Sequence, residues 1–128
     1  MPLFYSGQTD YIAKLNAGVT DTFSTSISAT VGGTTTLDLS SGGSFFVTMG
    51  AGNTTLSFIN VPTTAFLVVV YIKQDGVGSR TITSGPTGIL WAGGSVGLST
   101  GANKVDILEF RTVNSGTTWY GYKAAANL

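Results

Sequence analysis

The feature that most limits the fold of this chain is a succession of short apolar or alternating segments separated by turn-forming residues. Nine such segments follow one another at intervals of about 8 to 12 residues, and glycine-bearing turns separate most of them. This spacing is typical of all-β domains, and it predicts an antiparallel β-sandwich or a jelly-roll-like barrel. The expected strands cover residues 22–30, 35–39, 44–49, 54–61, 65–73, 79–83, 89–91, 105–113 and 117–122.

The segment 65–73 is the strongest strand candidate, because apolar residues occupy both of its faces. We therefore expect it at the centre of a sheet that is covered on both sides. Asp75-Gly76 after it is a hairpin signal, and Asn114-Ser115-Gly116 predicts another hairpin between the last two strands. An all-parallel β-helix is not favoured, because it would show a fixed repeat length and no such repeat is found.

The N-terminal segment, residues 1–20, is expected to form an arm ahead of a β-domain at residues 21–128. Thr9 or Asp10 can cap a helix of one or two turns over residues 11–17. A helix of fewer than about ten residues is not stable alone and has to dock on something. The arm could bind a partner, or it could close one end of its own sandwich, through the apolar side chains of Phe4, Tyr5, Tyr11, Ile12 and Leu15.

The chain contains no His and no Cys, and its six Lys and Arg residues balance six Asp and Glu residues. Ser-His-Asp and Cys-His catalysis, disulfides, and metal sites built on thiolate or imidazole are thereby excluded. Charged residues make up only 9% of the chain, which gives no electrostatic footprint for nucleic acid or an anionic membrane. We expect no cofactor, no metal ion, and neither nucleic acid nor membrane as a partner.

Carboxylates close in sequence could indicate a glycosidase, which needs two of them facing one cleft. Asp106 and Glu109 are separated by an odd number of positions, so on a regular strand they point to opposite faces. We therefore predict a protein that is not an enzyme. A pair assembled from distant strands, such as Asp38 with Asp106, stays open.

Four aromatic residues late in the chain are the strongest candidates for a binding surface. Trp91, Trp119, Tyr120 and Tyr122 could stack on sugar rings and form a glycan-binding face. The favoured alternative is that Trp119 packs inward while Tyr120 and Tyr122, on the opposite face, pack against a neighbouring subunit.

Two stretches resemble proteins of tailed-bacteriophage virions. The run TDYIAKLN at residues 9–16 looks like a short leader found at the start of tail-fibre and other virion-surface proteins. The second half is similar to a β-module that recurs in such proteins, in the runs GSRTIT (78–83), ILWAGG (89–94), STGANK (99–104), VDILEF (105–110) and GTTWYG (116–121).

The resemblance implies a structural protein without catalytic residues. A chain of 128 residues made of this module fits a capsid cement (decoration) protein better than a long tail fibre. We therefore expect a homo-oligomer, by preference a trimer, that binds the major capsid protein on the outer capsid surface. No signal peptide is visible, so synthesis in the host cytoplasm is expected. The alternative is a short tail-fibre or receptor-binding, glycan-binding virion module.

The low charge agrees with this expectation. A capsid under internal DNA pressure needs contacts that do not depend on salt, and neutral β-surfaces can provide them.

Overall fold

The first seven strands of the described chain alternate between two β-sheets, and the last two join the larger one. The structure, a computed structural model, describes residues 25–128. The predicted arm at residues 1–20, with Phe4, Tyr5, Tyr11, Ile12 and Leu15, lies outside these described residues. The elements are β1 (Thr25–Ser28), β2 (Thr34–Asp38), η1 (Leu39–Ser41), β3 (Ser44–Thr48), β4 (Thr54–Ile59), β5 (Phe66–Lys73), β6 (Ile82–Ser84), β7 (Ile89–Trp91), η2 (Ala92–Gly94), β8 (Val105–Thr112) and β9 (Trp119–Ala125).

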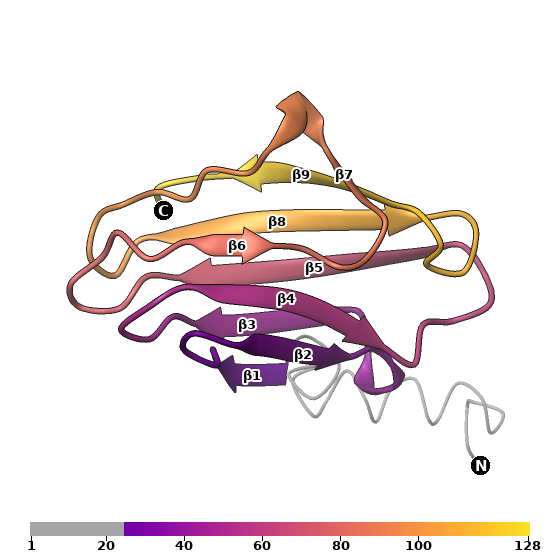
Figure 1. Cartoon of the computed structure of the whole chain (residues 1–128), viewed down its shortest axis with the longest axis horizontal. Coiled ribbons are helices and arrows are strands. Elements are labelled where there is room, and N and C mark those ends of the chain that lie inside the picture. Colours follow the sequence, from indigo (N-terminus) through magenta and orange to yellow (C-terminus); the bar gives the residue numbers. More distant parts are fainter. Residues whose placement is uncertain (1–24) are drawn as a thin grey trace, which may run out of the picture.

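All nine predicted strands are present within residues 25–128, and the all-β prediction is confirmed. A six-stranded sheet has the order β1-β3-β5-β8-β9-β7, and a three-stranded sheet has the order β2-β4-β6. Figure 1 shows that most strands of both sheets run along the long axis of the molecule. The strand β5 lies between β3 and β8, so its predicted central position is confirmed.

The predicted antiparallel pairing is wrong for most of the strand pairs. The strands β1, β3 and β5 pair in parallel, and so do β2, β4 and β6, and β7 with β9. Parallel neighbours in a sheet need a crossover connection. In the sequence β2 lies between β1 and β3, and β4 lies between β3 and β5, so these two strands of the smaller sheet are part of the crossovers. Antiparallel pairing occurs in the described chain only between β5 and β8 and between β8 and β9, where the predicted last hairpin is confirmed.

The turn after β5 explains one of these errors. Asp75-Gly76 predicts a hairpin, yet β5 and β6 lie in different sheets. The Asp75 carboxylate accepts hydrogen bonds from the N–H groups of Val77 and Gly78, and it pairs with the Arg80 guanidinium at 2.9 Å. Gly78 has a φ of 85°, which favours glycine. The turn closed by these hydrogen bonds connects β5 in the larger sheet to β6 in the smaller sheet.

A winding here is the stretch of chain that leaves the larger sheet, passes through the smaller sheet and returns to the next strand of the larger sheet. The two windings β1–β3 and β3–β5 differ in length. Thr25 pairs with Phe45, and Phe45 in turn pairs with Val70, so the second winding is longer than the first. Because a fixed period is the sequence signature of stacked windings, unequal windings leave no such signal.

The two sheets share one hydrophobic core. Phe58 on β4 contacts Phe110 and Trp119 of the larger sheet edge-on, with ring centroids 5.1 Å and 4.9 Å apart. The fully or nearly fully buried apolar residues come from both sheets and their connections: Leu37, Leu39, Phe45, Val47, Met49, Leu56, Val68, Val70, Ile72, Ile82, Leu108, Phe110 and Trp119.

Candidate functional site

The outer face of the six-stranded sheet carries large apolar side chains. Phe46 on β3 and Tyr71 on β5 are register partners, and their rings stack with centroids 6.1 Å apart and an angle of 17° between the ring planes. Ile107 on β8 is the next partner of Tyr71 in the same row. All three side chains are partly exposed. The strand β5 is thus buried on its inner face. Its outer face is only partly covered, so the prediction that both faces are covered is wrong for this face.

Further apolar side chains extend this surface toward the other edge of the sheet. Leu67 on β5, Tyr120 on β9 and Leu90 on β7 stand in one row, with Arg111 of β8 between Leu67 and Tyr120. The exposed fractions of the three apolar residues are 38%, 49% and 57%. Together with Phe46, Tyr71, Ile107, Val69 and Tyr122 they form what we call the docking face. Exposed apolar surface of this extent is typical of interaction sites.

Two charges on the docking face pair with each other, and Lys73, two residues after Tyr71 on β5, adds a third charge to the same face. The Tyr122 hydroxyl donates a short hydrogen bond to the Glu109 carboxylate and accepts one from the Arg111 guanidinium at 3.2 Å. Arg111 also lies 3.7 Å from Glu109. The hydrogen bond to Tyr122 is the main cause that raises the pKa of Arg111 above its usual value. The face is therefore largely apolar, with one internally compensated pair of charges and the additional charge of Lys73.

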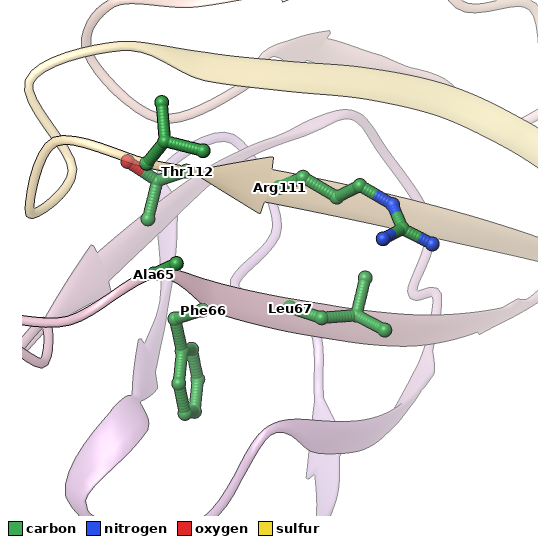
Figure 2. A pocket seen from close by; sticks show the side chains of 6 residues that line it. Ala65, Phe66, Leu67, Arg111 and Thr112 are labelled. Atoms are coloured by element: carbon green, nitrogen blue, oxygen red, sulfur yellow. The ribbon is translucent and has the colours of Figure 1, made fainter.

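A hollow of about 270 Å³ lies at the end of the docking face, where β5 begins and β8 ends. Figure 2 shows Leu67 and Arg111 on neighbouring strands of this hollow, and the register makes them direct partners. Phe66 and Val113 add apolar surface to its lining. The hollow widens the docking face rather than forming a separate enclosed site.

The outer face of the three-stranded sheet has a different chemistry. Thr34 pairs with Thr55, and Thr36 pairs with Ser57, so hydroxyl groups lie side by side across β2 and β4. The inward neighbours of these residues, among them Leu37 and Leu56, are fully buried. Small hydroxyl side chains suit a surface that stays in water. The last row of this surface pairs Asp38 with Ile59, which is 44% exposed. We call this surface the hydroxyl face.

The four aromatic residues singled out from the sequence lie in three different places. Trp119 is 1% exposed and belongs to the core, and Tyr120 lies on the docking face, as the alternation along the strand predicts. Tyr122 lies at the margin of that face, where it also lines a second hollow. Trp91, at the end of the edge strand β7, points to the inner side next to Gly121. They do not form one glycan-binding surface.

Two hollows adjoin Trp91, with volumes of about 360 Å³ and about 290 Å³. The first also involves Tyr122 and Lys123, and the second involves Thr83 and Ser84. The chain between β7 and β8 borders both hollows, because Ser95 and Val96 line each of them.

The carboxylates that could have formed a catalytic pair are engaged elsewhere. Asp106 is buried and Glu109 lies on the docking face, so their predicted separation is confirmed. Burial raises the pKa of Asp106, but hydrogen bonds from the Ser99 and Asn127 N–H groups outweigh this effect and leave the pKa lowered. Asp38 accepts hydrogen bonds from Ser40 and from the Asn60 side chain, which lower its pKa.

Two further observations concern ligands and membranes. Within residues 25–128, no three acidic, His or Cys side chains come together as a metal-binding group. In the same part of the chain, no helix has the length and apolar character to cross a membrane.

No protein-family model, no curated protein and no solved structure matches this chain. Its function therefore has to be inferred from the two outer faces and the surroundings of Trp91.

Phe46 and Tyr71 are absent from the residues predicted to form a surface. The apolar character of both faces of β5 could have indicated these residues. When a second sheet covers only one face of a strand, the apolar residues on its other face stay at the surface. Their pairing, however, depends on the parallel register of β3 and β5, which the sequence does not reveal.

Proposed function

We propose that this protein is a non-enzymatic structural protein of a tailed-bacteriophage virion, and specifically a capsid cement protein that binds the major capsid protein. The observation that carries the proposal is the contrast between its two outer faces. The docking face is built from stacked aromatic and aliphatic side chains, whereas the hydroxyl face carries Thr and Ser. In this proposal the domain is a sandwich with one face on the capsid and one in water.

The chemistry of the docking face suits a lattice contact. Apolar and aromatic side chains form the energetically dominant part of protein interfaces, and charges are depleted there. Glu109 and Arg111 compensate each other within the face, which leaves Lys73 as the other charge described there, so its contacts should depend little on ionic strength. The resemblances of the leader and the module to virion proteins support the assignment to a tailed-bacteriophage particle. The proposed oligomer is a trimer on the outer capsid surface.

The location on the particle is tested by electron microscopy of virions that carry labelled protein. The proposal predicts label on the head, distributed over the capsid lattice. Label confined to the tail would contradict the cement assignment. Turnover of capsular polysaccharide by the purified protein would contradict the non-enzymatic assignment.

A second candidate function is a short tail-fibre or receptor-binding module that recognises a glycan. The hollows beside Trp91 favour this candidate. A cement protein needs no affinity for the host, so binding of purified protein to host cells together with label on the tail distinguishes the second candidate from the first.

A further inference from the structure

The Trp91 indole is held in one position by its neighbours. The Phe110 ring meets it at a centroid distance of 5.3 Å and an angle of 64°. Gly121 lets it approach β9 closely, because a Cβ at that position would lie 2.8 Å from the indole atoms Cε3 and Cζ3. A Cβ on Gly85 would lie 3.1 Å from Cζ2. A side chain fixed in this way loses little conformational entropy when a ligand binds.

The residues that follow Trp91 leave part of the indole exposed. Ala92, Gly93, Gly94 and Ser95 are all exposed and small. Gly93 and Gly94 have φ values of 79° and 89°, a conformation that favours glycine over any larger residue. The chain therefore turns away from the indole without covering it, and the two hollows of about 360 Å³ and 290 Å³ remain on its borders.

Polar groups surround this aromatic surface. Ser95 borders both hollows, and the hydroxyl-bearing Thr83 and Ser84 border the smaller one. Lys123 lines the larger hollow, and its ammonium group donates one hydrogen bond, to the Gly97 carbonyl at 2.6 Å. An ammonium group has three donors, so two remain for acceptor oxygens of a ligand.

Buried side chains hold the connection between β7 and β8, which borders the hollows, in place. The buried Gln74 side chain donates to the Ser99 carbonyl at 2.9 Å, and the buried Asp106 carboxylate accepts from the Ser99 N–H at 2.6 Å. Val96 and Leu98 pack against the hydrophobic core. The hollows beside Trp91 are thus largely formed before any ligand arrives, as is usual for binding sites.

We propose that the hollows beside Trp91 bind a pyranose ring of a glycan. A pyranose has an apolar face of C–H groups, which packs on an aromatic ring, and a rim of hydroxyl groups, which exchange hydrogen bonds with Ser, Thr and Lys side chains. The site adjoins the docking face at Tyr122, which lines the larger hollow, but Trp91 itself points to the inner side of the sheet. A single sugar of about a dozen heavy atoms binds with roughly millimolar affinity in a site of this kind.

The two tryptophans provide a direct readout. Trp119 is 1% exposed and lies in the core, whereas Trp91 borders both hollows. In proton–nitrogen NMR spectra of the full chain, titration with methyl glycosides of common hexoses, N-acetylhexosamines and hexuronic acids is expected to shift the indole N–H signal of Trp91. The amide signals of residues 92–97 and 123 should move with it, while the Trp119 indole and Tyr120 signals stay in place.

Two variants test whether the hollow itself is responsible. Ser95→Tyr places a large side chain at the border of both hollows without touching the core, and it should abolish the shifts at unchanged thermal stability. Tyr120→Ala, on the docking face, should leave the titration unchanged. The inference is overturned if no glycoside in the panel shifts the Trp91 signal at tens of millimolar, or if Ser95→Tyr binds as the wild type does. Because this experiment uses no capsid, its outcome is independent of the proposed cement function.

Discussion

Gln74 and Asp106 together satisfy both backbone groups of Ser99. The Gln74 amide Nε2 donates to the Ser99 carbonyl at 2.9 Å, and the Asp106 Oδ2 accepts from the Ser99 N–H at 2.6 Å. Both side chains are 2% exposed. Asp106 also accepts from the Asn127 N–H at 2.9 Å. A buried amide and a buried carboxylate therefore fix the long connection between β7 and β8 and the C-terminal end of the chain.

Replacement of Asp106 by Asn is expected to destabilise the fold. An Asn side chain has one acceptor oxygen and presents a donor to the second N–H group, which leaves a buried donor unpaired. The free energy of unfolding should fall by about 1–3 kcal/mol, measured by urea denaturation. Glu109→Gln, on the same strand but on the docking face, is the control and should cost clearly less. Equal losses in the two variants would contradict the structural role of Asp106.

Acid is expected to weaken the turn at Asp75. A hydrogen bond from the Arg80 side chain is the main cause that lowers the pKa of Asp75 from 3.8 to about 2. Because the fold favours the charged carboxylate, its stabilising contribution is complete above the unfolded pKa and is lost as the pH falls from about 4 to 2. The stability difference between wild type and Asp75→Asn should shrink across this pH range. A difference that stays constant would contradict the ion pair.

Gly121 is expected to tolerate no side chain. In Gly121→Ala the new Cβ would lie 2.8 Å from the Trp91 ring, and the indole or β9 has to shift. Overpacking of this kind costs about 1–3 kcal/mol, which thermal or urea denaturation would detect. Gly97→Ala is the matched control, because its added Cβ meets no atom within 4 Å. If both variants were as stable as the wild type, Trp91 would not be seated on β9.

The positions of the strands can be predicted from the sequence, but their pairing cannot. Alternation of polar and apolar residues locates each strand to within a few residues, and it correctly separates Asp106 from Glu109 and Trp119 from Tyr120. Pairing depends on where each turn sends the chain. Asp75-Gly76 has the composition of a hairpin, yet its hydrogen bonds to Val77 and Gly78 carry the chain to the other sheet.

Prediction of the surfaces is limited for the same reason. Phe46 and Tyr71 lie far apart in the sequence and become neighbours only through the parallel register of β3 and β5. Trp91 can be recognised as an unusual residue, but its setting depends on Gly121, which comes much later in the chain and pairs with it across β7 and β9. Local patterns contain no information about either contact.

The arm at residues 1–20 is predicted to contribute to capsid binding, and its residues 1–17 can be deleted to test this. Deletion of these residues should lower the number of copies bound to each capsid, measured by quantitative gel analysis of purified particles. The β-domain of the truncated chain should unfold at an unchanged denaturant concentration. Undiminished capsid binding by the truncated protein would show that the arm is dispensable for this contact.

The docking face is tested most directly by placing one charge on each outer face and measuring capsid occupancy. Tyr71→Glu introduces a carboxylate beside Phe46 on the docking face, and Thr36→Glu introduces one on the hydroxyl face. Burial of an unpaired charge should weaken capsid binding by Tyr71→Glu roughly tenfold or more, whereas Thr36→Glu should bind as the wild type does. Wild-type occupancy by a folded Tyr71→Glu protein, or loss of binding only in Thr36→Glu, would contradict the assignment of the docking face.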